Sequence, residues 1–222
     1  MTTKQVRVER FSVTSSKSFE EVVARLEAAV GHPDMNEFRS EVASAKTYAE
    51  IEKVIHRVIG VSGFMEFIRF DLGEIVRKER GEQAPQSLRF LIGNPLIMKQ
   101  MIESVPDAGS YAPVTILIDV RGDGVHLSYD RMASLLAPYG SAEALKVARD
   151  LDAKVERLGR AVFHHDVILP QCGPTGWYGT KHVLSRGRVL ERVAAPRISS
   201  GFADQRRSQP RIALISPLVA VD

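Results

Sequence analysis

Cysteine is almost absent from this sequence, which contains only Cys172. One thiol cannot form a disulfide within the chain, and it excludes a zinc site built from several thiolates. Long apolar runs are also missing, and the longest falls far short of the roughly 18 residues that a membrane-spanning helix requires. Residues 1–10 contain no apolar signal core, so we expect a mature cytoplasmic protein without a membrane segment.

Motifs of the common enzyme classes are missing as well. The chain has no Gly-x-Gly-x-x-Gly, no Gly-x-Ser-x-Gly and no His-Glu-x-x-His. Their absence argues against dinucleotide, serine-hydrolase and metalloprotease chemistry, without excluding an enzyme. No usual ligand spacing relates the candidate zinc ligands near the C-terminus, which are His164, His165, Cys172 and His182. We therefore expect neither a metal nor a cofactor.

Charge is distributed unevenly along the 222 residues. Residues 1–160 have a net charge of −1 and residues 161–222 one of +4, so the pI near 9.1 reflects the C-terminal segment. The nearly neutral body argues against nucleic-acid binding through phosphate contacts. Residues 161–222 are rich in Arg, Pro and Gly, and we interpret them as an irregular tail. This tail is either an unfamiliar extension or the product of translation outside the ancestral reading frame.

Capping motifs mark several helices within residues 1–160. Ser18 and Thr47 each open a capping box, and Ser141 suits the cap of a long helix. The segment 62–70 fits either a helix face or an aromatic-rich strand, and its periodicity favours the helix. The other predicted helices lie over residues 34–45, 71–79, 96–105, 130–137 and 142–158, and the predicted strands over 5–14, 88–92, 113–120 and 125–129.

The tripeptide Gly93-Asn94-Pro95 joins an apolar strand to a helix. Asn94 is a good N-cap, and Pro95 suits the first helical position because its missing N–H costs nothing there. The junction either holds an anionic or carbonyl group on the helix N-terminus or simply caps the helix. It lacks the lysine and the additional glycine of a phosphate-binding loop.

A hairpin is predicted around Asp123-Gly124, because this dipeptide suits the central positions of a type I′ turn. A two-residue turn sets Asp119 opposite Ser128, whereas a four-residue loop sets it opposite His126. The second register gives either a carboxylate–imidazole pair for acid–base work or an ordinary exposed cross-strand pair. Alternation gives the hairpin an apolar core face and a wetter face. The wetter face carries Thr115, Leu117, Asp119, His126, Ser128 and Asp130.

These motifs resemble the domain of unknown function 302 family, which has the TT1751-like fold. The resemblance covers residues 5–158 and rests on four segments, namely Ser18-Phe-Glu-Glu-Val-Val23, Phe90-Leu-Ile-Gly-Asn-Pro95, Tyr111-Ala-Pro113 and Val125-His-Leu-Ser-Tyr129 with Met132-Ala-Ser-Leu-Leu136. It implies an α+β domain over residues 1–160, with a mainly antiparallel β-sheet packed against several helices and often dimeric. It implies no activity. Many members carry Asp-His where this chain has Asp71-Leu72, so no chemistry of that histidine is expected.

We therefore expect a non-enzymatic domain that binds a small molecule or another protein, such as a second copy in a homodimer. The predicted ligand site is a shallow pocket on the wetter face of the sheet, closed by the strand–helix junction. Its residues are Gly93, Asn94, Pro95, Asp119, His126 and Ser128. The alternative is a small enzyme that uses His126 as general base, with Asp119 or Asp130 orienting it.

Overall fold

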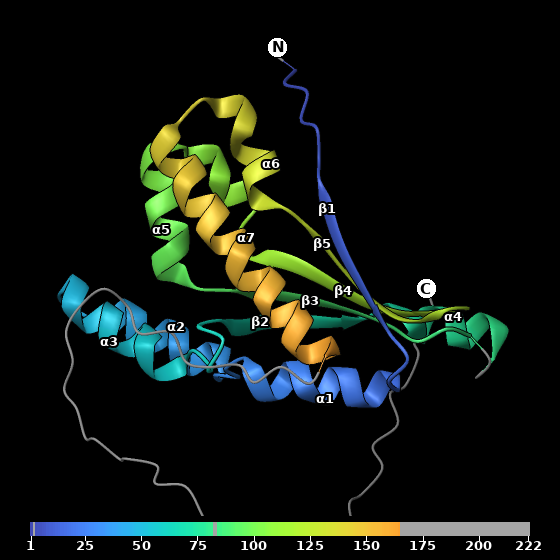
Figure 1. Ribbon diagram of the computed structural model, residues 1–222. Helices are drawn as coiled ribbons and strands as arrows, with labels where there is room; N and C mark the ends of the chain where they lie inside the picture. The colour runs from blue at the N-terminus through green and yellow to red at the C-terminus, as the bar shows by residue number, and fades with distance from the viewer. Residues whose placement is uncertain (2, 82–83, 165–222) are drawn as a thin grey trace, which may run out of the picture. The chain divides into compact units, whose positions relative to one another are not determined.

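The strands form one five-stranded antiparallel sheet in the computed structural model, which describes residues 1, 3–81 and 84–164 (Figure 1). Their bounds are β1 Arg10–Ser15, β2 Met65–Asp71, β3 Ser87–Gly93, β4 Val114–Arg121 and β5 Gly124–Asp130. The strand order is β1-β5-β4-β3-β2, and each neighbouring pair is antiparallel. The α+β class with a mainly antiparallel sheet is confirmed. The tail predicted from residue 161 lies almost wholly outside the described residues.

Helices connect and cover these strands. Their bounds are α1 Phe19–Ala29, α2 Met35–Ser44, α3 Tyr48–Val58, α4 Leu72–Arg80, α5 Pro95–Ser104, α6 Met132–Leu136 and α7 Ala142–Phe163, with 3₁₀ turns η1 Pro106–Ser110 and η2 Ala137–Tyr139. The predicted caps are confirmed, because a side-chain oxygen accepts a first-turn backbone N–H at Ser18, Thr47, Asn94 and Ser141. Within the described ranges, no helix has both the length and the apolar character needed to cross a bilayer.

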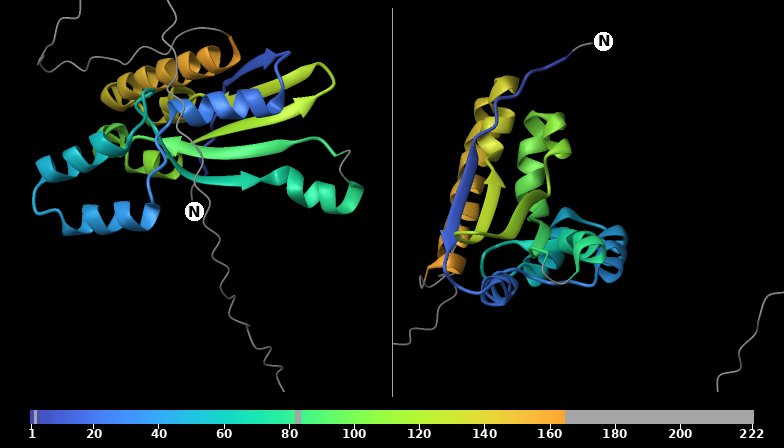
Figure 2. Two further views of the ribbon diagram at one scale, coloured as in Figure 1. Left: turned by 90° about the horizontal axis from the view of Figure 1, so that it is seen from below. Right: turned by 90° about the vertical axis from the view of Figure 1, so that its right-hand side faces the viewer.

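One face of the sheet is covered by helices and forms the main core. Helices α1 and α7 lie on this face, and α5 and α6 pack against α7 (Figures 1 and 2). The predicted core face of the hairpin is confirmed. Strand β4 buries alternate side chains, as the period of two requires, whereas β5 buries the core-face residues together with His126 and Ser128 between them. The buried members are Val114, Ile116, Ile118, Val125, Leu127 and Tyr129.

A second, smaller cluster anchors α2 and α3 to the start of β2. Its buried members are Phe38, Ile55 and Met65. The same region is tied by backbone hydrogen bonds, since Gly31 donates to the Phe64 carbonyl and Glu66 donates to the Gly31 carbonyl. Helices α2 and α3 therefore lie at one end of the sheet, and α4 lies at the other (Figure 2).

Two strands differ from the sequence expectations at their ends. Strand β1 begins at Arg10 and not at residue 5, because the Glu9 backbone turns to α6 and donates to Ser134 Oγ. The ambiguous segment 62–70 contains strand β2, which has a bulge between Glu66 and Ile68. An added residue shifts the side-chain alternation, and this explains why periodicity did not identify the strand. Helix α4 then begins after Asp71, whose Oδ1 accepts the Glu74 N–H.

The β4–β5 turn also differs from the prediction. Arg121 pairs with Gly124, so Gly122 and Asp123 occupy the central positions and the expected Asp123-Gly124 centre is wrong. Gly124 has φ of 136°, and a Cβ there would lie 2.5 Å from the Ser15 carbonyl oxygen. Only glycine fits this close approach without strain. The resulting register sets Asp119 opposite His126, as the second alternative proposed.

Candidate functional site

An apolar pocket lies at the junction of β3 and α5. It encloses about 470 Å³, including the space open to solvent. Gly93, Asn94 and Pro95, three of the six residues predicted to form a ligand site, line one side of it. The other walls are apolar and include Phe67, Met98, Met101, Pro113 and Leu151. A pocket with such walls is suited to an apolar group and gives little support to a charge.

The first turn of α5 has no N–H group left for an anion. Pro95 has no N–H, Leu96 donates to Asn94 Oδ1 at 2.9 Å, and Ile97 and Met98 both donate to the Asn94 carbonyl at 3.1 Å. The Asn94 side chain is fully used, since its Nδ2 donates to the Gly63 carbonyl at 3.0 Å. These hydrogen bonds are those of the capping alternative, in which Asn94 caps the helix and holds the loop before β2.

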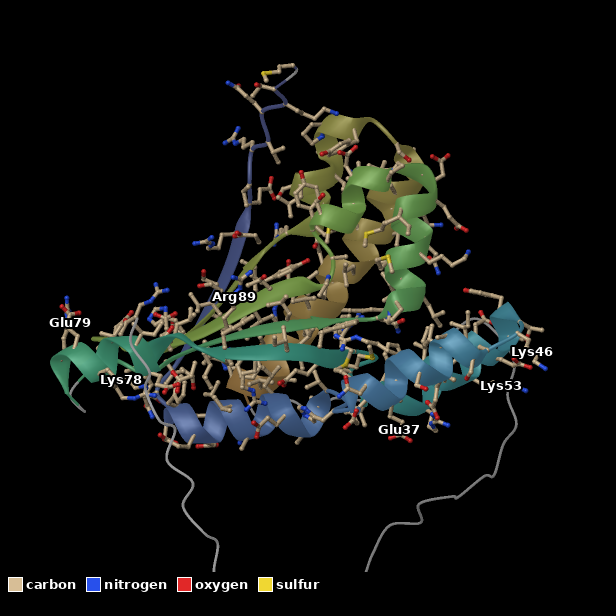
Figure 3. The ribbon with its side chains drawn as sticks, turned by 180° about the vertical axis from the view of Figure 1, so that it is seen from behind. Glu37, Lys46, Lys53, Lys78, Glu79 and Arg89 are labelled. Atoms are coloured by element: carbon tan, nitrogen blue, oxygen red, sulfur yellow. The ribbon has the colours of Figure 1, made fainter. Side chains whose placement is uncertain are left out.

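The opposite face of the sheet is covered by none of the helices within the described residues, and we call it the uncovered face (Figure 3). It carries a broad groove. The groove encloses about 1300 Å³, including the solvent above it, and extends from Leu72 to Met132. Ser128 lies in it, together with Arg89 and Leu91 of β3. Its lining mixes apolar and polar side chains, in contrast to the pocket.

Two arginines in the groove have different electrostatic partners. Arg10 forms a bidentate pair with Asp130, with Nε–Oδ1 of 2.6 Å and Nη2–Oδ2 of 2.9 Å. This contact raises the pKa of Arg10. Arg89 donates only to the neutral Thr115 Oγ1, at 3.3 Å, and has no ion pair within the described part of the chain. Figure 3 shows Arg89 on the uncovered face of the sheet.

His126 lies at the hairpin end of the sheet and is only 8% exposed. Its Nε2 is 2.7 Å from Asp123 Oδ1, and its Nδ1 is 3.2 Å from Thr14 Oγ1. The hydrogen bond to His126 lowers the pKa of Asp123. Asp119, the expected carboxylate partner, instead pairs with Arg121 at 2.7 Å. Asp119 and His126 lie opposite each other, but no hydrogen bond joins them within the described residues, so the acid–base alternative for this pair is not seen.

A buried carboxylate on α7 caps α6, and no motif in the sequence predicts this contact. Asp152 Oδ1 accepts the Tyr129 hydroxyl at 2.6 Å and the Met132 N–H at 2.7 Å, and its Oδ2 accepts the Ala133 N–H at 3.0 Å. Burial raises the pKa of Asp152, and burial with the nearby carboxylate raises the pKa of Tyr129. The local sequence offers one signal for this contact. Arg131, at the N-cap of α6, makes no side-chain cap, so the cap comes from elsewhere in the chain.

The predicted site residues fall into three places in the structure. Gly93, Asn94 and Pro95 line the pocket, Ser128 lines the groove, and the Asp119 and His126 pair borders neither hollow. The face that was predicted to be exposed to water is less exposed than expected, since His126 and Ser128 are both buried. The pocket and the groove nevertheless adjoin, because both are lined by Ala112, Pro113 and Val114.

The sequence analysis missed several residues that line these hollows. Arg89 and Leu91 lie in the segment 88–92, which the sequence predicts only as an apolar strand, although Arg89 is exposed. The alternation Arg89, Leu91, Gly93 is a usable signal for an uncovered face. Phe67 comes from β2, whereas Met98 and Met101 lie three residues apart on α5, so no single motif identifies all three together.

Metal ligands do not cluster in the described ranges, where no group of three or more His, Cys, Asp or Glu side chains could hold an ion. His164 ends α7, whereas His165, Cys172 and His182 lie outside those ranges.

Comparison with known proteins identifies the family. The profile of the domain of unknown function DUF302 matches residues 40–162, more than half of the chain. A crystal structure of an uncharacterized conserved DUF302 protein from Bacillus stearothermophilus is similar, with a TM-score of 0.49 and 11% sequence identity over 70% of this chain and 98% of that one. No curated protein matches. The profile match over the sheet and its helices shows that this chain belongs to the DUF302 family.

Proposed function

We propose that this domain binds a small molecule and that an apolar part of that molecule occupies the β3–α5 pocket. The observation that supports the proposal is the composition of the pocket wall. Among the described residues, Asn94 supplies the one polar side chain of this wall, and hydrogen bonds to Gly63 and Leu96 use both of its polar atoms. A ligand in this pocket gains affinity from apolar burial, at about 25 cal/mol per Å².

Methionine methyl groups provide a direct readout of this pocket. Met98 and Met101 line the pocket, whereas Met132 lines the groove. In the full chain labelled with ¹³C-methyl methionine, titration with indole is expected to shift the Met98 and Met101 signals and to leave the Met132 signal almost unchanged. If only Met132 responds, the pocket is not the binding site.

A matched pair of glycine substitutions tests the location. A Cβ at Gly93 would lie 3.4 Å from both Phe67 Cε2 and Pro113 Cβ, so Gly93→Ala adds a methyl group to the pocket wall. We expect it to weaken indole binding about tenfold, because overfilling costs about 1–3 kcal/mol. Gly109→Ala is the control, since a Cβ there meets only Ile102 Cγ2 at 3.8 Å. Equal affinity of the two variants would contradict the proposal.

A second candidate function is self-association into a homodimer. Four apolar side chains on β2 and α4 form an exposed strip, which we call the β2–α4 strip. Its members are Ile68, Phe70, Leu72 and Ile75, with exposed fractions of 45%, 41%, 40% and 76%. A contiguous exposed apolar patch is typical of an interaction surface.

Sedimentation velocity tests this second function. We expect the full chain to sediment as a dimer and the double variant Phe70→Ser/Ile75→Ser as a monomer. Val61→Ser is the control, because Val61 is 52% exposed but lies outside the β2–α4 strip. A monomeric wild-type protein would exclude the strip as a homodimer interface.

A further inference from the structure

Strand β3 presents three alternate positions on the uncovered face of the sheet. Arg89 and Leu91 line the groove, and Gly93 lines the pocket. The intervening residues Phe90 and Ile92 point to the opposite side and are fully buried in the core. Along β3, the uncovered face therefore presents first a cation, then an apolar side chain and then a glycine, which has no side chain.

Arg89, the cation among these three positions, has apolar neighbours on both adjacent strands. Arg89 pairs with Phe70 of β2 on one side and with Leu117 of β4 on the other. Phe70 is 41% exposed and Leu117 is half-buried. Its guanidinium has only the Thr115 hydroxyl as partner among the described residues. Arg89 thus has free donors beside a surface that favours apolar contact.

Gly93, the last of these three positions, lines the pocket. A Cβ at Gly93 would point between Phe67 and Pro113, two residues of the pocket wall, and would make contact with both. Glycine leaves this space free. The groove and the pocket also share Val114, the first residue of β4, and Ala112, which lies just before that strand. A chain-like molecule that lies along β3 can therefore pass from the groove into the pocket.

We propose that the ligand is an amphiphile with one carboxylate, which Arg89 binds while the apolar chain runs over Leu91 into the pocket. The hydrogen-bond donors set the orientation of the ligand. The polar side chain in the pocket wall is already hydrogen-bonded, whereas Arg89 has donors without a partner among the described residues. Arg89 and Gly93 are four residues apart, about 13 Å along a strand, which suits a medium-chain fatty acid. This inference rests on the proposed pocket function.

Decanoate and decanol, which differ in their head groups, separate the two claims. In the full chain labelled with ¹³C-methyl methionine, both molecules are expected to shift the Met98 and Met101 signals. Decanoate should bind about fivefold more tightly, because a hydrogen bond to a charged group adds roughly 1 kcal/mol at an exposed site. Arg89→Gln should remove this preference, and Arg89→Lys should retain part of it. Arg39→Gln, an exposed arginine on α2, is the control.

The outcomes distinguish failure of this inference from failure of the pocket. If decanoate and decanol shift Met98 and Met101 with equal affinity, the carboxylate site is wrong and the pocket function stands. If decanoate binds more tightly but shifts only Met132, the path into the pocket is wrong. If neither molecule shifts Met98 or Met101, both proposals fail. Circular dichroism of Arg89→Gln checks that the variant is folded, and unchanged decanoate preference in a folded variant overturns the role of Arg89.

Discussion

The two faces of the sheet handle polar groups in opposite ways. On the covered face, Leu127 and its neighbours are excluded from water, and the Tyr129 hydroxyl is satisfied by Asp152. On the uncovered face, charged groups such as Arg10 and Asp130 pair in contact with solvent, and Arg89 has only the Thr115 hydroxyl as partner among the described residues. The difference indicates that the covered face holds the fold together, and it is on the uncovered face that we propose the carboxylate site.

The largest expected loss of stability comes from removing Asp152 from the polar network on the covered face. Asp152→Ala should lower the free energy of unfolding by about 3–4 kcal/mol, because two buried donors and one part-buried donor lose this acceptor. Denaturation in urea measures the loss. Asp150→Ala is the control, since Asp150 is exposed on the same helix. Equal losses in the two variants would show that Asp152 does not cap α6.

A pair of leucine substitutions compares the faces directly. Leu127 is 0% exposed on the covered face, and Leu127→Ala should cost about 3 kcal/mol. Leu117 is half-buried on the uncovered face, and Leu117→Ala should cost about 1 kcal/mol or less. Urea denaturation of both variants gives the difference. A cost at Leu117 equal to that at Leu127 would mean that something covers the face assigned to binding.

The pH dependence of stability sharpens the account of Asp152. Burial raises its pKa above the ordinary carboxyl value, so the folded state binds this proton more tightly than the unfolded state. The Asp152 contribution to stability is therefore full below the ordinary carboxyl pKa and declines as pH rises toward the raised value. The advantage of wild type over Asp152→Asn should shrink over this interval. An advantage that grows with pH would show that hydrogen bonding outweighs burial.

The smallest effect is expected at the hairpin end of the uncovered face. The His126 hydrogen bond lowers the pKa of Asp123, so this contact stabilises the fold above the ordinary carboxyl pKa and is lost as pH falls through the lowered value. Asp123→Asn should change stability less than any variant above, because Asp123 is exposed to solvent. Thermal unfolding at neutral and acidic pH checks this. A loss as large as that of Leu127→Ala would make the pair part of the core.

Local chemistry allowed much of the fold to be predicted. Ser18, Thr47, Asn94 and Ser141 cap helices because each needs only a neighbour two or three residues away. The core face of β4 and β5 followed from alternation alone. The bulge in β2 could not be predicted, because it depends on pairing with β3.

The candidate site was predicted only in part, for the same reason. Gly93, Asn94 and Pro95 form a local motif, and they do line a pocket. The opposite wall includes Leu151, which is far along the chain, and only tertiary packing brings it there. For Asp119 and His126, one of the two predicted registers is the observed one, but it did not identify the contact. The two residues lie opposite each other, yet the carboxylate partner of His126 is Asp123.

A crystal structure of the full chain with bound decanoate tests the central claim most directly. The account predicts the carboxylate on the Arg89 guanidinium, the alkyl chain beside Leu91, and its end in the pocket between Phe67 and Pro113. A pocket that stays empty while decanoate binds elsewhere, or a chain that enters it with the carboxylate away from Arg89, would contradict the account.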